Sequence, residues 1–200
     1  CRSATPPASC RRTAPRCRRC STWTGWRCFA GHRALCSAAG LKAARSATAA
    51  PLLAKGFFTE ELDLLKLKLA GADAALVILR DVDDQRAAAL ISYARELGLE
   101  TLVEAHDANE LHRAIALGAE VIGVNARDLT TFQIDRAQQL ELVTRLRDHD
   151  AVVVAESGVR SRAQGAAAEL AGADAVLVGS ALMQAPDPPA ASEVRLSPTG

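Results

Sequence analysis

Short apolar runs recur about every 20 to 30 residues along the chain from residue 51 onward. Each run is followed by a polar turn, an amphipathic stretch and a stop of small residues, and this spacing is the length of one strand followed by one helix. Continuous apolar runs are typical of parallel strands that are buried on both faces. The pattern therefore predicts a parallel sheet covered by helices, with strands at 51–54, 74–79, 101–103, 121–124, 151–155 and 175–178.

Local signals delimit the helices between these strands. Asp107 followed by Glu110 fits a capping box, and another helix is expected to begin near Asp84 and to stop at Gly98. A repeated AGADA motif marks the bend from helix into strand. It occurs at 70–74 and at 171–175.

The periodicity does not choose between an open, doubly wound sheet and a closed barrel. Six strands suffice for an open sheet, whereas an eight-stranded barrel needs two more strand-helix units than the pattern supplies.

Charge and cysteine content divide the chain. Residues 1–50 hold ten of the 24 Lys and Arg, none of the 23 Asp and Glu, and all six Cys. This predicts a basic, Cys- and Arg-rich segment at 1–45 and a barrel domain at 46–200. The net charge of +1 indicates no special partner. Without a membrane-length apolar run or a secretory signal, we expect a cytoplasmic protein that binds neither membrane nor nucleic acid.

The basic segment has alternative interpretations. Cys17 and Cys20, flanked by Cys10, Cys28 and Cys36, invite a zinc or nucleic-acid module, but their spacing fits no standard paired pattern. A mixture of Arg, Cys, Ala and Pro is also what a GC-rich coding sequence yields in the wrong frame. We favour this second interpretation, in which the segment replaces two genuine strand-helix units, and we expect it to be disordered.

Polar residues follow the apolar runs where each strand would end. The carboxyl ends of parallel strands share one face of the sheet, so these side chains are expected to converge. Lys55 and Glu104 would form a proton-transfer pair there. The converging residues are Lys55, Glu104, Asn125, Arg127, Glu156, Ser157 and Gly158.

Small residues after the last two runs predict an anion site. Gly158, Gly179 and Ser180 would leave backbone N–H groups open to a phosphate. His106, in the loop after Glu104, is a weaker candidate for a group that supports the site residues, because a solvated or helix-capping histidine is the more common case. The acidic cluster at 81–84 is better explained as a helix start than as a cation site.

Taken together, these residues resemble the indole-3-glycerol-phosphate synthase family, lyases of tryptophan biosynthesis. The resemblance covers about residues 41–188 and favours the barrel, with the six runs as the third to eighth strands of an incomplete (β/α)₈ TIM barrel. It is carried by PLLAKGFF, AGADAALVILRDVDD, LGLETLVEAHDANELHRAIALGAEVIGVNARDL, VVVAESGV and AGADAVLVGSALM.

The resemblance implies a reaction. A carboxyphenylamino-deoxyribulose phosphate closes onto its aromatic ring and loses carbon dioxide and water, giving indole-3-glycerol phosphate, with no cofactor or metal. Association with other enzymes of the tryptophan pathway is also implied. Lys55 would be the general acid in ring closure, Glu104 the general base in dehydration, and Asn125 a hydrogen-bond donor to the substrate. The remaining residues would bind substrate (Arg127, Glu156, Ser157) or its phosphate (Gly158, Gly179, Ser180).

The chain also departs from the family pattern. Ala54 and Gly56 flank Lys55 where the family has an Arg-like residue and an Asp, so we expect a less well positioned ammonium. Residues 1–40 lack the Glu, the Lys and the Ser-Pro-Ser loop of the family's first strand, so we expect low activity and exposed sheet edges. Two other functions stay open: another phosphate-binding barrel enzyme such as phosphoribosylanthranilate isomerase, and a non-catalytic barrel remnant carrying a Cys- and Arg-rich binding segment.

Overall fold

A computed structural model describes residues 27–29 and 37–184 of the chain. The candidate zinc cysteines, apart from the backbone of Cys28, and the tail after residue 184 lie outside these residues. None of the helices in the described part is long and apolar enough to cross a membrane.

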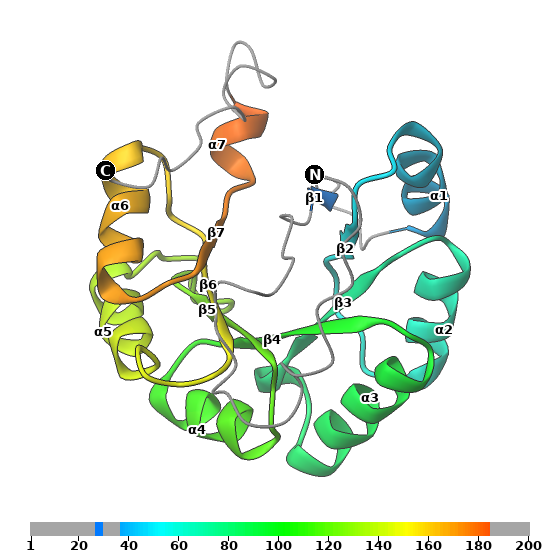
Figure 1. Cartoon of the computed structure of the whole chain (residues 1–200), viewed down its shortest axis with the longest axis horizontal. Coiled ribbons are helices and arrows are strands. Elements are labelled where there is room, and N and C mark those ends of the chain that lie inside the picture. Colours follow the sequence, from blue (N-terminus) through cyan, green and yellow to red (C-terminus); the bar gives the residue numbers. More distant parts are fainter. Residues whose placement is uncertain (1–26, 30–36, 185–200) are drawn as a thin grey trace, which may run out of the picture.

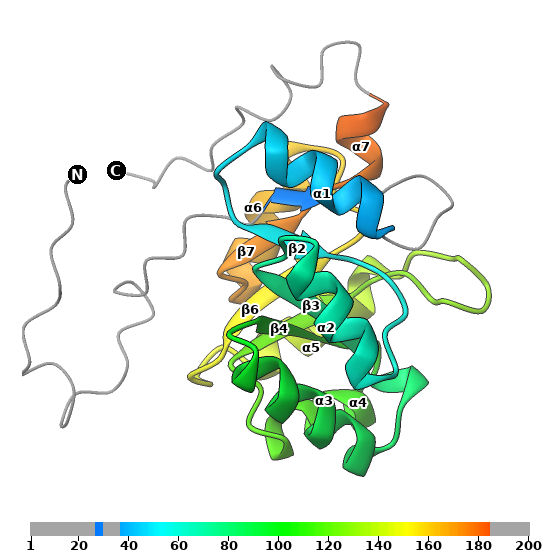
Figure 2. The same ribbon diagram turned by 90° about the vertical axis from the view of Figure 1, so that its right-hand side faces the viewer.

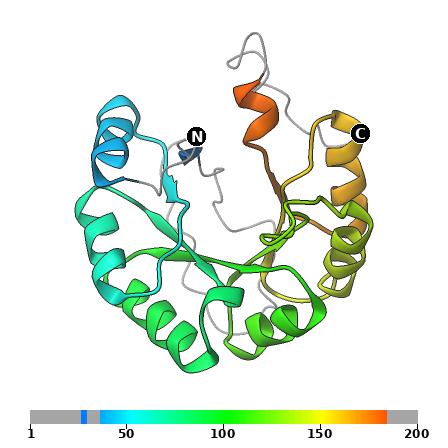
Figure 3. The same ribbon diagram turned by 180° about the vertical axis from the view of Figure 1, so that it is seen from behind.

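Within the described residues, seven parallel strands form one sheet in which the strands follow their order in the chain. The sheet curls, and α1 to α6 form an arc around its outer side (Figures 1 and 3). The side view shows α1, α2 and α3 following one another along that side (Figure 2). A doubly wound sheet would carry helices on both faces, so the curled sheet is of the barrel type. The elements are β1 (Arg27–Phe29), α1 (Ala38–Ala47), β2 (Leu52–Ala54), α2 (Glu61–Leu69), β3 (Ala74–Ile78), the 3₁₀ helix η2 (Leu79–Asp81), α3 (Asp84–Glu96), β4 (Glu100–Ala105), α4 (Ala108–Ala116), β5 (Val121–Asn125), α5 (Arg136–Arg145), β6 (Val152–Glu156), α6 (Arg162–Ala171), β7 (Ala175–Leu177) and α7 (Ser180–Met183).

The six predicted strands correspond to β2 to β7, and β4 extends beyond its predicted bounds on both sides. The sequence pattern did not predict β1, whose Arg27 pairs with Leu52 at the start of β2. The boundary predicted near residue 45 falls inside α1, where Leu41 and Ala44 are buried. Since most of segment 1–45 lies outside the described residues, its separation from the barrel stays a prediction.

Alternating residues of each strand divide the core into an outer and an inner part. In β3, Ala75 and Val77 pack outward toward the helices, whereas Leu76 and Ile78 belong to the inner cluster. This alternation follows from the two-residue period of a strand. The buried members of the inner cluster are Leu53, Ala74, Leu76, Ile78, Leu102, Val121 and Val154.

The repeated AGADA motif performs the same task twice. The Asp73 carboxylate accepts a hydrogen bond of 2.7 Å from the N–H of Leu52, and the Asp174 carboxylate accepts one of 2.8 Å from Val153. In return, each aspartate N–H donates to the carbonyl of the same partner. Each motif therefore joins the start of one strand to the start of a neighbouring strand.

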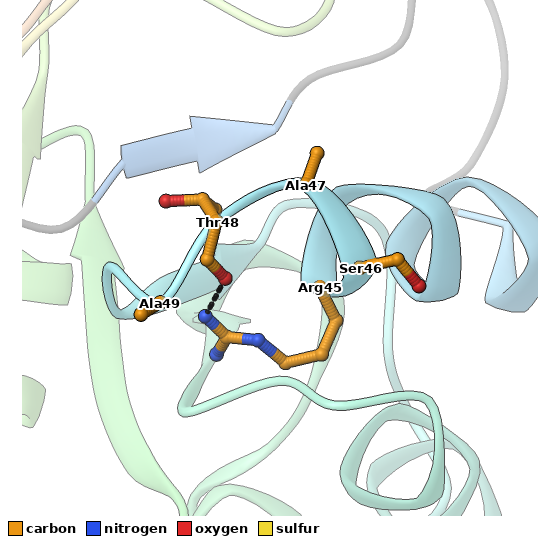
Figure 4. Close-up of a pocket in the computed structure, with 5 residues that line it drawn as sticks. All are labelled: Arg45, Ser46, Ala47, Thr48 and Ala49. Atoms are coloured by element: carbon orange, nitrogen blue, oxygen red, sulfur yellow. Dashed lines mark hydrogen bonds between the residues drawn. The ribbon is translucent and has the colours of Figure 1, made fainter.

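A cavity of about 540 Å³ lies beside the carboxyl end of α1, lined by residues 45–49. The Arg45 guanidinium turns back onto the Thr48 carbonyl (Figure 4) and also donates to the Ala50 carbonyl at 2.7 Å and to Asp73 at 3.0 Å. Arg45 thus connects α1 to the turn before β3. The residues that line the cavity precede β2 in the chain, and the cavity lies away from the carboxyl ends of the strands.

Candidate functional site

Four polar side chains lie on the inner side of the sheet near the carboxyl ends of their strands. Each is an even number of residues after an inner-cluster residue of the strand that carries it or, for Lys55, of the strand that ends one residue earlier, so the strand period directs it inward. Three of these strands are hydrogen-bonded neighbours, because β4 pairs with β5 and β5 with β6. The four residues, with the inner residue that precedes each, are Lys55 after Leu53, Glu104 after Leu102, Asn125 after Val121 and Glu156 after Val154.

The Lys55 ammonium is shared by two carboxyl groups. Its Nζ lies 3.2 Å from Oε2 of Glu104 and also contacts Oε2 of Glu156. The side chains are 18% exposed for Lys55, 2% for Glu104 and 0% for Glu156. The structure thus brings the predicted Lys55 and Glu104 pair together and adds a second acid. The ammonium is held in place despite the departures at Ala54 and Gly56.

The two glutamates differ in proton affinity. Burial and the repulsion by Glu104 outweigh the attraction of Lys55 and raise the pKa of Glu156 to about 8. Burial acts on Glu104 as well, but there His106, Lys55 and Asn125 outweigh it and lower its pKa to about 2. The two shifts have opposite directions, so the site favours the carboxylate form of Glu104 and the protonated form of Glu156. Such a divided pair is typical of sites that need an acid and a base.

Asn125 connects two parts of the site. Its Nδ2 donates a hydrogen bond of 2.9 Å to Oε1 of Glu104, and its Oδ1 accepts one of 2.9 Å from the N–H of Arg127. The amide therefore orients the Glu104 carboxylate and fixes the start of the loop that carries Arg127.

Gln139 on α5 stabilises the backbone beneath the site, and the sequence analysis did not identify it. Its Nε2 donates to the carbonyls of Val124 and Glu156, both at 2.6 Å, and its side chain is 1% exposed. The amide thus joins the carboxyl ends of β5 and β6 beneath the site. A glutamine on the apolar face of α5, close to Leu142 and Val143, was the signal that could have indicated it.

His106 is buried, so the interpretation as a solvated or capping histidine is wrong. Only 6% of the residue is exposed, and Asp107 rather than His106 caps α4. Glu110 completes the expected capping box one residue early, because its side chain accepts from the N–H of His106.

The acidic cluster at 81–84 begins a helix, as expected. Asp83 is the N-cap of α3 and accepts from Arg86 at 2.8 Å, and Asp84 pairs with Arg113. Among the described residues, no group of three or more His, Cys, Asp or Glu is placed to hold a metal ion.

A cavity of about 130 Å³ collects the residues predicted to hold a phosphate. Ser157 and Gly158 both have positive φ, of 65° and 74°, so the chain turns sharply after β6. A side chain on Gly158 would be strained in that conformation and would meet Ile134 at 2.7 Å. Two cations also line this cavity. Its lining includes Arg127, Ser157, Gly158, Arg160, Gly179 and Ser180.

The glycine at position 56, one of the departures from the family pattern, is explained by its surroundings. A Cβ there would lie 2.6 Å from the ring of Phe58, which is 8% exposed. The ring therefore occupies the space that a side chain at this position would need.

Comparisons with known proteins agree with this geometry. The family model described as indole-3-glycerol phosphate synthase matches residues 20–194. Indole-3-glycerol phosphate synthase 2 of Streptomyces coelicolor is 46% identical over 148 residues, covering 74% of this chain and 57% of the relative. The enzyme of Carboxydothermus hydrogenoformans is 39% identical over 157 residues, covering 78% and 60%.

Among solved structures, a mutant tryptophan synthase alpha-subunit from Pyrococcus furiosus matches with a TM-score of 0.60 and 21% identity. The match covers 72% of this chain and 62% of that one, and it supports the TIM-barrel fold alone. The chain spans less than two thirds of the length of the two curated relatives. With 175 of its residues inside the family match, the chain belongs to the indole-3-glycerol phosphate synthase family.

Proposed function

We propose that the chain converts 1-(2-carboxyphenylamino)-1-deoxyribulose 5-phosphate to indole-3-glycerol phosphate, with loss of carbon dioxide and water. The observation that carries the proposal is the Lys55 ammonium, held 3.2 Å from Glu104 and in contact with Glu156 at the carboxyl ends of the strands. A cation with two acids of opposite protonation state suits a reaction that needs both proton donation and proton removal.

Each polar residue receives a role in this proposal. Lys55 donates a proton to the substrate's ketone oxygen as the aromatic ring carbon bonds to the ketone carbon, and the carboxyl group then leaves as carbon dioxide. The resulting hydroxyl takes up a proton from solvent and leaves as water, while Glu104 accepts the proton that the adjacent substrate carbon loses as the ring double bond forms. Asn125 hydrogen-bonds the substrate, and Glu156 with Ser157 lines the cavity.

The substrate phosphate is assigned to the 130 Å³ cavity. Gly158, Gly179 and Ser180 present small side chains and backbone donors there, and the Arg127 guanidinium supplies positive charge. This placement puts the anion beside the end of β6, next to Glu156, so that one substrate could reach both groups.

The test follows indole fluorescence as the carboxyphenylamino substrate is consumed by the purified chain, with Lys55→Ala and Glu104→Ala beside it. Loss of one general acid or base typically lowers the rate by about 10²- to 10⁴-fold, and each variant should lose activity on that scale. Lys66→Ala, which removes an exposed ammonium on α2, should keep the wild-type rate.

An inactive but folded wild-type chain would contradict the proposal, and so would a Lys55→Ala variant as active as Lys66→Ala. The same chain can be incubated with a phosphoribosylanthranilate substrate, because turnover there would favour the isomerase alternative. The family match gives that alternative no support.

Location and partners are proposed in the same way. The biosynthetic relatives support a cytoplasmic location, and the family resemblance supports association with other enzymes of the pathway. Co-purification of the tagged chain with such an enzyme would test it.

A further inference from the structure

His106 lies directly after β4 with each ring nitrogen facing a carboxylate. Its Nδ1 is 2.9 Å from Oε2 of Glu110, and its Nε2 is 3.2 Å from Oε1 of Glu104. His106 Nε2 makes no other hydrogen bond among the described residues, so Glu104 is the group that it faces. Only 3% of the His106 side chain is exposed. The ring thus fills the space between the proposed base and α4.

Glu110 fixes this ring from the side of α4. Its Oε2 accepts from the backbone N–H of His106 at 2.7 Å as well as facing Nδ1, and its Oε1 lies 3.2 Å from Nε of Arg80. Arg80 in turn reaches Asp128 in the loop after β5, at 3.4 Å. Charges of alternating sign therefore run from Glu104 through the histidine to the loop that carries Arg127.

The surroundings of the ring favour its doubly protonated form. A neutral imidazole has one N–H and could satisfy one carboxylate, whereas the cation presents an N–H to each. Burial opposes the charge, but Glu104 and Glu110 outweigh it and raise the pKa of His106 to about 9. Asp81 on η2 adds negative charge on the same side, and Arg80 adds positive charge beyond Glu110.

Glu104 therefore faces two cations with different tasks. Lys55 lies on Oε2, and its proposed role requires it to turn to the substrate and to give up a proton. His106 lies on Oε1, behind the carboxylate, and has no such task. We propose that His106 is a positioning residue that keeps Glu104 ionised and oriented while Lys55 is engaged with the substrate. This inference rests on the proposed function for the role of Glu104.

The first test needs no enzymatic activity. Side-chain NMR of the full chain follows His106 during a pH titration, with the exposed His112 on α4 as the internal reference. We expect His106 to remain protonated well above its ordinary value of 6.5, and its pKa to fall by about one unit or more in Glu104→Gln and in Glu110→Gln. A ring that titrates near 6.5 and ignores both substitutions would overturn the inference.

The second test compares His106→Asn with His112→Asn in the lyase assay. Loss of the buried cation should lower kcat about 10- to 100-fold with little change in KM, and should move the acidic limb of the kcat profile to higher pH, because Glu104 becomes easier to protonate. His106→Gln should move that limb in the same direction and serves if His106→Asn does not fold. A rate loss that is uniform across pH would mean a merely structural histidine.

The two tests separate the two claims. A wild-type chain without lyase activity whose His106 still responds to Glu104→Gln would remove the proposed function and leave the ion pair standing. The chain could instead be active while the His106 titration ignores Glu104→Gln and the acidic limb of the kcat profile ignores His106→Asn. That result would contradict the role of His106 and leave the proposed function intact.

Discussion

The carboxyl group of Glu156 on β6 fills the space beside Gly123 on β5 where a side chain would lie. A Cβ built on Gly123 would lie 1.8 Å from Oε1 of Glu156, which is fully buried. The carboxyl group thus lies where the side chain of residue 123 would otherwise point. The site therefore depends on a missing side chain as much as on those that are present.

Gly123→Ala should displace the Glu156 carboxyl from its place beside Lys55. Overpacking of this kind costs about 1–3 kcal/mol, so we expect the free energy of unfolding to fall by that amount and the lyase rate to fall with it. Urea denaturation measures the first effect. In Gly179→Ala the added Cβ meets nothing within 4 Å, and the free energy of unfolding should not change. Equal stability of the two variants would contradict the steric argument.

Gly179→Ala should instead weaken substrate binding. Gly179 lines the 130 Å³ cavity, and its missing side chain leaves space for an anion. We expect KM for the phosphorylated substrate to rise several-fold while kcat stays near the wild-type value. Steady-state kinetics decides the matter, since an unchanged KM would place the phosphate elsewhere.

The raised pKa of Glu156 predicts a pH dependence of stability. Its pKa rises from 4.5 to about 8 on folding, so its contribution to stability is complete below 4.5 and is lost as the pH rises toward 8. Glu156→Gln removes the titration. The free energy of unfolding of the wild type should therefore fall relative to Glu156→Gln across this window. Parallel pH profiles of the two proteins in chemical denaturation would show that Glu156 is ionised throughout.

Gln139→Ala should destabilise the protein through the backbone. The substitution removes the amide hydrogen bonds to the carbonyls of Val124 and Glu156, although the Glu156 carbonyl keeps a hydrogen bond from the N–H of Ala126, and each lost hydrogen bond costs about 0.5–1.5 kcal/mol. We expect a loss of about 1–3 kcal/mol in the free energy of unfolding. The exposed Gln138→Ala on the same helix is the control and should change little. Comparable losses in both variants would point to helix propensity instead.

The sequence predicted the strands from β2 to β7 because each carries a continuous apolar run. It also predicted Lys55 and Glu104 as neighbours because both follow such runs in a parallel sheet. β1 escaped prediction because Arg27, Cys28 and Phe29 form no apolar run. Gln139 escaped because its partners come from β5 and β6, so that its burial depends on how α5 packs against the strand ends. His106 was only a weaker candidate, because its burial depends on how α4 with Glu110 packs against the end of β4.

The AGADA aspartates lie at the amino ends of the strands, and the lysine and glutamates lie at the carboxyl ends. The two sets share no hydrogen bond among the described contacts. Protein engineering can therefore treat the amino ends of the strands as the part that sets stability and the carboxyl ends as the part that sets catalysis. Substitutions around Asp73 and Asp174 would tune how firmly the strands are anchored, and those around Lys55 would tune the chemistry, with each set open to optimisation on its own.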